Sequence, residues 1–150
     1  MEVEEYIGNV FMVKFYLKAH SLSPNKYHFL TNYGAAQTVI FTVIAIMLAV
    51  FKGREVEYPS FAFMGSNTKF CDERADELKA NTKRFRSYKR IISIFFGSQT
   101  FEFIKDETAS ILIIKNRGAK IDEQMSIILQ HIYNNYEILE INLMSDDGKA

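Results

Sequence analysis

The longest apolar stretch of the chain runs from Ala35 to Phe51 and contains no charged residue. A helix needs about 20 apolar residues to cross a bilayer, and the strongly apolar part here, Val39 to Phe51, is shorter. We therefore predict a central helix covered on several sides, because helices that are apolar all round are usually buried. Thr38, Thr42, Ala45 and Ala49 form a stripe of small residues along this helix. Within it, the Ala45/Ala49 pair has the spacing of paired membrane helices, so a membrane helix stays open as an alternative.

Alternation of apolar and polar residues predicts short strands on both sides of this helix. Val10 to Lys18 alternates in this way. Lys26 to Thr31 follows a Ser-Pro-Asn turn, so these two segments are predicted to pair as a hairpin. The other predicted strands are 61–64, 100–105, 110–115 and 138–143, of which 100–105 and 110–115 form a second hairpin.

Helical periodicity predicts two further helices. One runs from Thr68 to Phe95, with a candidate break at Asn81-Thr82, and the other covers 121–136, the clearest amphipathic segment. The order of elements favours an α+β fold: a single-layer, mostly antiparallel sheet packed against three helices, one of them strongly apolar. We expect one domain, 1–150, with a polar tail at 145–150.

The charge composition indicates which kinds of binding protein this chain can be. The chain has 18 basic and 18 acidic residues, whereas proteins that bind nucleic acid or anionic lipid over their whole surface usually carry a basic excess. The balance partly reflects a local cancellation between acids at 72–77 and bases at 83–90, so one patch can still be basic. A single cysteine cannot form an internal disulfide, and the first ten residues lack the basic and apolar regions of an export signal, so we expect a cytoplasmic protein.

The segment 61–90 is the strongest candidate for chemistry. Gly65 and Ser66 follow a buried strand, where backbone N–H groups can face an anion. The basic segment 83–90 offers arginines, whose planar fork suits phosphate, and a tyrosine, whose flat face suits bases. We predict a site for a phosphate-bearing partner, namely RNA, DNA or a nucleotide, at five residues: Gly65, Ser66, Arg84, Arg86 and Tyr88.

A purely structural interpretation of the same segment stays open. Gly-Ser is a common turn, and neither GxxxxGK[ST] nor GxGxxG spacing is present. Acids at 72–77 followed by bases at 83–90 would also suit the dipole of one long solvated helix.

The other reactive side chains form no recognised pattern. His20, His28 and His131 lack the spacing of a metal site. Cys71 has no partner motif. Glu102 is a conceivable general base that nothing distinguishes from a solvated strand residue. We therefore predict neither a metal site nor a cofactor.

Several segments together show a family resemblance. YHFLTNYG, TVIFTVIAIMLAVF, FAFMGSNT and RFRSYKRII follow one another within 27–92. The succession resembles small uncharacterised bacterial proteins, common in Bacteroidetes, with a Gly-Ser-Thr and an Arg-x-Arg-x-Tyr motif. Thr68 lies one place later than the family's threonine, and 69–81 looks like an insertion between the two motifs. The family has no assigned activity, and its members look like products of mobile or defence-associated gene pairs, so the resemblance implies a toxin or phage-defence component.

Two functions follow from these observations. The first is binding of a nucleic-acid backbone or a nucleotide, in which arginines would stabilise phosphate charge and, in an enzyme, Ser66 or Tyr88 would position or relay a proton. The second is a non-catalytic interaction protein that forms a homodimer or binds a small partner protein, favoured by the many Phe, Tyr and Ile residues. Whether the protein is an enzyme stays open.

Overall fold

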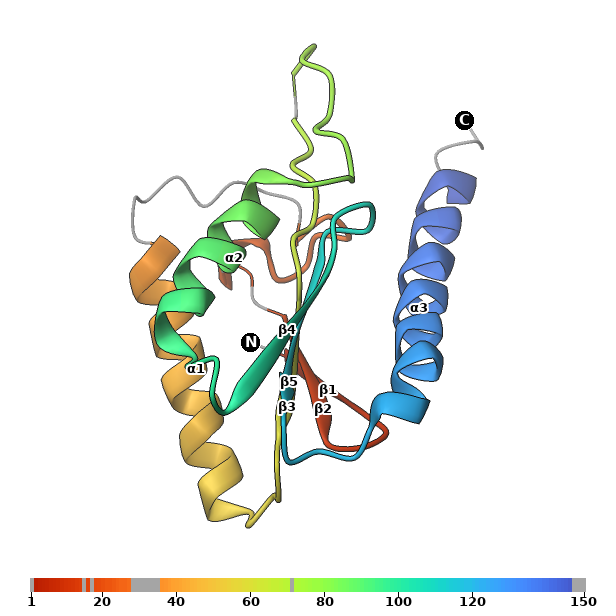
Figure 1. The fold of residues 1–150 in the computed structure, drawn as a ribbon. Helices are drawn as coiled ribbons and strands as arrows, with labels where there is room; N and C mark the ends of the chain where they lie inside the picture. Colours follow the sequence, from red (N-terminus) through yellow and green to blue (C-terminus); the bar gives the residue numbers. More distant parts are fainter. Residues whose placement is uncertain (1, 15, 17, 28–35, 71, 147–150) are drawn as a thin grey trace. The chain divides into compact units, whose positions relative to one another are not determined.

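Five strands form one mixed sheet in the computed structural model, in the order β1-β2-β3-β5-β4 (Figure 1). β1 pairs with β2, β3 with β5 and β4 with β5 in antiparallel fashion, whereas β2 and β3 are parallel. The described residues also form three α-helices, so the predicted α+β fold with a mostly antiparallel sheet is confirmed. The strands are β1 (Glu2–Tyr6), β2 (Val10–Lys14), β3 (Ser60–Met64), β4 (Phe101–Asp106) and β5 (Ile111–Asn116).

The structure describes residues 2–14, 16, 18–27, 36–70 and 72–146, with the backbone alone at 36 and 136–146. Contacts divide the chain into two units, 1–119 and 120–150. The first unit holds the sheet, the short helical turn η1 (Lys18–His20), α1 (Ala36–Gly53) and α2 (Lys83–Phe95). The second holds the turn η2 (Asp122–Gln124) and α3 (Met125–Asp146).

The first predicted hairpin is wrong. β2 ends at Lys14 and pairs with β1, a strand that the sequence analysis did not assign. Gly8 and Asn9 join the two strands with φ angles of 77° and 58°, a region that these residues enter at small cost. Lys26 lies in a turn, and residues 28–31 of the predicted partner strand lie outside the described residues.

The predicted helix at 68–95 is wrong in its first half, because α2 begins at Lys83. Acidic side chains upstream bind loop N–H groups instead: Asp76 Oδ1 accepts from Phe70 N at 3.1 Å and Asp72 Oδ1 from Arg74 N at 3.0 Å. Such local hydrogen bonds compete with helix formation. Acids 72–77 and bases 83–90 therefore do not share one helix.

The predicted last strand at 138–143 is also wrong, because α3 continues to Asp146. A short apolar run is compatible with either helix or strand when only its periodicity is considered. The expected polar tail thus begins inside a helix, and 147–150 lie outside the described residues.

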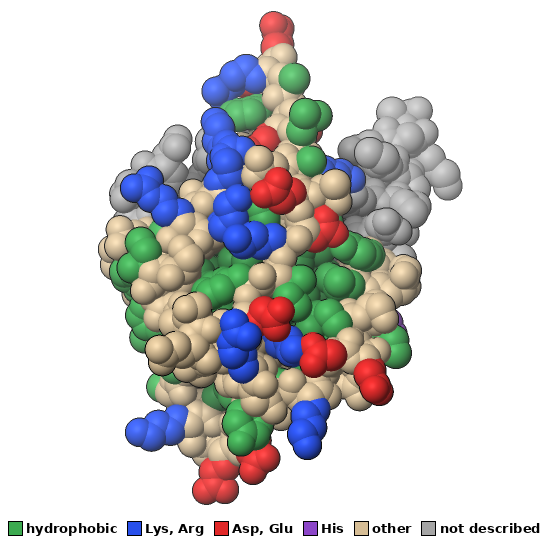
Figure 2. Space-filling view, in the orientation of Figure 1, with side chains coloured by type: hydrophobic (Ala, Val, Ile, Leu, Met, Phe, Trp, Pro, Cys, Tyr) green, Lys and Arg blue, Asp and Glu red, His purple; other side chains and the backbone are tan. Residues whose placement is uncertain are grey.

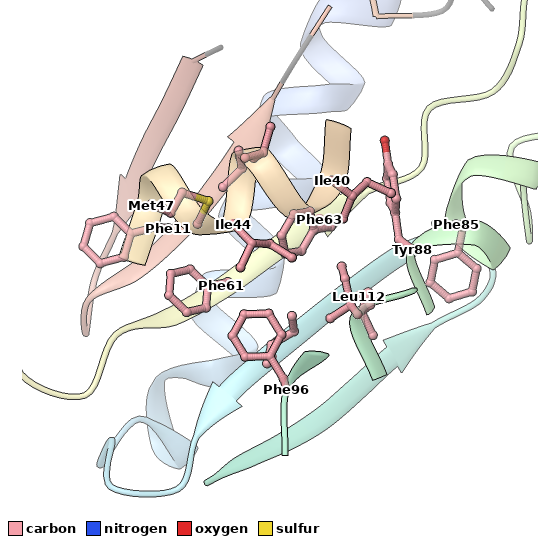
Figure 3. Packing of buried hydrophobic residues seen from close by; sticks show 14 of the residues in the cluster. Phe11, Ile40, Ile44, Met47, Phe61, Phe63, Phe85, Tyr88, Phe96 and Leu112 are labelled. Carbon is pink, nitrogen blue, oxygen red and sulfur yellow. The ribbon is translucent and has the colours of Figure 1, made fainter. Parts of the chain in front are cut away.

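One face of the sheet packs against α1 and α2 (Figures 1 and 3). Figure 3 shows Ile40 and Ile44 of α1 directed toward the aromatic rings of β3, Phe61 and Phe63. Full burial of each such side chain contributes roughly 1.5–3 kcal/mol. The buried cluster comprises Phe11, Val13, Ile40, Val43, Ile44, Met47, Phe51, Phe61, Phe63, Phe85, Tyr88, Ile92, Phe96, Leu112 and Ile114.

The apolar helix predicted at 35–51 is present as α1, but the prediction that it is covered on several sides is wrong. Only one side of α1 is buried, and the opposite side is exposed. In the part of the chain that the structure describes, none of the helices combines the length and apolar character that a bilayer crossing requires.

Candidate functional site

The end of β3 and the start of α2 meet at Gly65. A Cβ atom on this glycine would lie 2.6 Å from Thr82 Oγ1 and 2.7 Å from Phe85 Cα, so only glycine fits without a shift of the helix. Its N–H donates to the carbonyl of Ser110 at 2.9 Å, and its own carbonyl accepts from the Thr82 hydroxyl at 2.6 Å. Both backbone groups of Gly65 are therefore used within the fold, and its N–H does not face an anion.

Thr82 is the N-cap of α2 and fixes this junction. Its hydroxyl oxygen accepts from Phe85 N at 3.1 Å, and its N–H donates to Ser110 Oγ at 3.0 Å. Ser110 Oγ in turn donates to the carbonyl of Lys79 at 2.6 Å. This buried chain of hydrogen bonds ties β3, β5 and α2 together, so the start of α2 is set firmly against the sheet.

Arg84 and Ser66 lie close together, as predicted, but Ser66 contributes its carbonyl oxygen, an acceptor, to this contact. The half-buried Arg84 guanidinium donates from Nη1 to the carbonyl of Ser66 at 3.2 Å and to the carbonyl of Tyr27. Burial lowers the pKa of Arg84, an effect that the nearby Tyr88 and Glu77 partly offset. The arginine thus joins the end of β3 to the segment at Tyr27.

Arg86 and Tyr88 face different surroundings. Arg86 is exposed and folds back to donate to the carbonyl of Asn81. The Tyr88 side chain is only 7% exposed, and its ring centre lies 5.9 Å from that of Phe63. Burial raises the pKa of Tyr88 to about 12, although Arg84 acts in the opposite direction. The Tyr88 ring is therefore part of the core and presents no flat face to solvent (Figure 3).

The start of α2 already binds an anion, the carboxylate of Glu77. Its Oε1 accepts from Lys83 N at 2.7 Å and its Oε2 from Thr68 N at 2.9 Å. Burial raises the pKa of Glu77, but the N–H groups of Lys83 and Thr68, with the nearby Thr68 hydroxyl, lower it by more, so the pKa lies below its ordinary value. The sequence gives no signal for this pairing, because Glu77 reaches α2 from the preceding loop and matches no capping motif.

The exposed side of α2 is basic. Lys83, Arg86 and Arg90 are exposed and share one side of the helix, being three and four residues apart. Lys89 Nζ pairs with Glu107 at 3.2 Å. Figure 2 shows blue Lys and Arg side chains gathered over α2, beside red Asp and Glu side chains over the β4–β5 hairpin. The local basic patch expected from the charge pattern is therefore present.

The outer face of α1 is apolar. We use this name for the exposed residues Thr38, Val39, Thr42, Ala45, Ile46, Ala49 and Val50. Val39, Ile46 and Val50 are 42%, 44% and 42% exposed, and Ile94 at the end of α2 is 73% exposed. The rings of Phe41 on α1 and Phe95 on α2 lie 5.4 Å apart, so apolar surface extends from one helix to the other.

A further polar cluster, for which the sequence gives no signal, surrounds Glu2. Its carboxylate accepts from Lys26 Nζ at 2.9 Å, from the Tyr16 hydroxyl at 3.2 Å and from the Tyr27 hydroxyl. The Lys26 ammonium lies 4.3 Å from the Tyr16 ring centre and 5.1 Å from that of Tyr27. The hydrogen bond from Tyr27, followed by that from Lys26, lowers the pKa of Glu2 to about 2.

The remaining candidates gain no support for a catalytic or metal role. Glu102 is half exposed and pairs with Lys115 Nζ at 3.6 Å. His28 and Cys71 lie outside the described residues. Within the described ranges, no group of three His, Cys, Asp or Glu side chains is placed to hold a metal ion.

Comparison with known proteins gives no match. No protein-family model, no curated protein and no solved structure is similar to this chain. The resemblance to small Bacteroidetes proteins therefore stays a prediction, and function has to be argued from the site geometry alone.

Proposed function

We propose that the protein acts through protein–protein contact and that the outer face of α1, together with the end of α2, is its contact surface. One observation carries the proposal: large apolar side chains are exposed next to one another on two adjacent helices. Soluble monomers rarely expose contiguous apolar patches beyond a few hundred Å², and larger ones mark interaction sites.

The middle of the outer face is suited to a second helix. Thr38, Thr42, Ala45 and Ala49 follow one another at spacings of four and three residues, and larger side chains flank them. Small residues let two helix backbones approach closely. The Thr42 hydroxyl already donates to the Thr38 carbonyl at 2.8 Å, so covering it leaves no donor unsatisfied.

The occupant that fits this face is a second copy of the chain. A two-fold contact places the same residues on both sides, and α1 carries no charge before Lys52. Such a contact would bury no unpaired charge, which is the main cost of joining two identical surfaces. An 18-residue helix is about 27 Å long, and a single helix pair buries less than the roughly 800 Å² per partner of a standard interface. We therefore expect a weak, concentration-dependent dimer.

Sedimentation velocity between about 1 and 100 μM, the range in which a weak dimer dissociates, tests this proposal. The wild type is expected to shift from monomer to dimer, and Ile46→Lys to stay monomeric with an unchanged far-UV circular dichroism spectrum. Leu22→Lys is the matched control, because Leu22 is 98% exposed and lies outside α1. A wild type that is monomeric throughout, or an Ile46→Lys variant that still dimerises, would contradict the homodimer.

A second candidate function, binding of a nucleic-acid backbone, is favoured by the exposed stripe of Lys83, Arg86 and Arg90. Three phosphate contacts would give an affinity for RNA that falls with salt, and each lost contact would reduce the slope of log K against log salt by about 0.7–0.9. Titration of the Arg86→Ala/Arg90→Ala variant against single-stranded RNA at several salt concentrations measures this slope. A slope equal to that of the wild type would rule out contacts from this stripe.

A further inference from the structure

The two helices that pack on the sheet carry bases but no acid. Neither α1 nor α2 contains Asp or Glu, although the whole chain has as many acidic as basic residues. The bases are Lys52 of α1 and Lys83, Arg84, Arg86, Lys89 and Arg90 of α2. The acids of this neutral chain therefore lie outside the two helices, whose exposed side chains are apolar, uncharged polar or basic.

The exposed bases of α2 lead directly into the apolar surface. Arg86 and Arg90 are exposed, and Ile94, which is 73% exposed, follows Arg90 by four residues on the same side of the helix. Four residues span about 6 Å of an α-helix. In the part of the chain that the structure describes, no ion pair joins Arg86 or Arg90 to a carboxylate. One continuous region of the two helices is therefore apolar at one end and basic at the other.

Neither a second copy nor RNA would use the whole of this region. A second copy would cover the outer face of α1, but its own α1 and α2 would bring bases and no acid, and like charges brought together oppose binding. Single-stranded RNA would pair with Arg86 and Arg90, but its charged backbone would leave Val39, Ile46 and Ile94 without an apolar partner. The partner that matches the region has to be apolar and anionic at once.

A bilayer that contains anionic lipid has both properties. Helices that lie in a membrane interface have an apolar side and Lys or Arg beside it, and their binding combines buried apolar area with attraction to anionic lipid. The outer face of α1 supplies the apolar area, and the exposed side of α2 supplies the charge. The Thr42 hydroxyl already donates to the Thr38 carbonyl at 2.8 Å, so covering the face with lipid leaves this donor satisfied.

We propose that the outer face of α1 and the exposed side of α2 dock on an anionic lipid bilayer. Val39, Ile46 and Ile94 enter the boundary between headgroups and acyl chains, and Arg86 and Arg90 contact lipid phosphates. This docking goes beyond the proposed dimer and uses the same apolar face. A chain docked in this way cannot form the dimer through that face, so the bilayer and a second copy compete for it.

Cosedimentation with sucrose-loaded vesicles tests the basic part of the region. One set of vesicles is phosphatidylcholine alone, and the other is an equal mixture with phosphatidylglycerol. The wild type should bind the mixed vesicles at least about tenfold more tightly, because each base near an anionic surface strengthens binding about fivefold, or about 1 kcal/mol. Arg86→Ala/Arg90→Ala should lose most of this preference. Lys18→Ala/Lys120→Ala, the matched control, removes two exposed bases outside α1 and α2 and should keep it.

Three results would overturn the docking. The first is equal binding of the wild type to both kinds of vesicle, or binding to neither. The second is an equal loss in the two double variants, which would show attraction by net charge alone. The third is an Arg86→Ala/Arg90→Ala variant that loses affinity for RNA but not for mixed vesicles, which would assign these arginines to nucleic acid.

Ile46→Ser/Ile94→Ser tests the apolar part. It should lower affinity for the mixed vesicles at least about tenfold, because two aliphatic side chains no longer enter the bilayer. Leu22→Ser/Leu78→Ser is the matched control, since these leucines are 98% and 80% exposed and lie outside both helices. Unchanged binding of Ile46→Ser/Ile94→Ser, with an unchanged circular dichroism spectrum, would overturn the docking.

Sedimentation velocity without vesicles separates the docking from the dimer. A wild type that is monomeric but binds the mixed vesicles would contradict the dimer and support the docking. A wild type that dimerises but binds no vesicles would support the dimer and overturn the docking.

Discussion

The outer face of α1 and the start of α2 lie in the same unit. They differ in whether their side chains and backbone groups already have partners within the chain. The outer face of α1 is an apolar surface with several aliphatic side chains at about 40% exposure. Covering these side chains would release water. The start of α2 is a network in which backbone N–H groups have partners within the chain. The outer face of α1 therefore suits a broad, weak protein partner, whereas the start of α2 is closed by its own contacts.

The two regions also differ in how a substitution would act. On the outer face of α1, a change should leave the monomer intact and alter only the proposed dimer and the proposed docking on a bilayer, because the large side chains there are about 40% exposed. At the start of α2, a change alters the fold, because Gly65, Thr82 and Arg84 connect several elements. The following predictions test this contrast.

The largest effect is expected from comparing the two sides of α1. Ile44, 1% exposed, faces the sheet, and Ile44→Ala should lower the free energy of unfolding by about 2–5 kcal/mol. Ile46→Ala on the outer side should change it by no more than about 0.5 kcal/mol at monomeric concentration. Urea denaturation measures both, and similar losses at the two positions would mean that the outer face is covered within the monomer.

Gly65→Ala is expected to cost about 3 kcal/mol, because the added methyl group would meet Thr82 Oγ1 and the backbone of α2. Gly97→Ala is the control: a Cβ at Gly97 has no neighbour within 4 Å. Thermal unfolding of the two variants gives the comparison. Little loss at Gly65 would show that α2 can move away from β3.

Arg84→Met should lower stability by about 2 kcal/mol, because it removes a charged donor from two carbonyl oxygens. Arg90→Met, at an exposed position of the same helix, should change it by less than about 0.5 kcal/mol. Chemical denaturation at high salt separates this packing role from surface charge. Equal effects at both positions would make Arg84 an ordinary surface cation.

The smallest predicted effect is a loss of stability at acid pH. The pKa of Glu2 is lowered from 4.5 to about 2, so its stabilising contribution is complete above about pH 4.5 and is lost as the pH falls toward 2. The difference in melting temperature between the wild type and Glu2→Gln should therefore be constant near neutral pH and shrink through this window. In the Tyr27→Phe background, which lacks the first donor to Glu2, the difference made by Glu2→Gln should be smaller and should be fully lost at a higher pH, because the folded pKa of Glu2 lies closer to 4.5. A constant difference down to pH 2 would contradict the assignment.

Much of the fold was predictable because it rests on local patterns. The helix at α1, the strand β3 and the β4–β5 hairpin follow from periodicity, and all three are present. The strand β1 was not predicted, because three of its five residues are glutamates. The Gly8-Asn9 pair before an apolar strand was its one clear signal.

The candidate site was less predictable, because its contacts are not local. The sequence placed Ser66 near Arg84, and the structure confirms that proximity. It could not show that Arg84 would meet a carbonyl oxygen, that the Tyr88 ring would face the core or that Glu77 would occupy the helix start. Each of these depends on the path of 65–82, where acidic side chains bind the backbone and prevent a helix.

The position of β3 in the sheet has a consequence for how the chain folds. β1 with β2 and β4 with β5 are hairpins between neighbouring segments, whereas β3 pairs only with distant residues, Val10 with Ser60 and Phe61 with Ile114. Hairpins form within microseconds. β3 can pair only after two long loops have closed, and closing a loop costs conformational entropy before any stabilising contact forms. The central strand, the most protected part of the finished sheet, should therefore be among the last to form, so nascent chains would expose its aromatic residues longest.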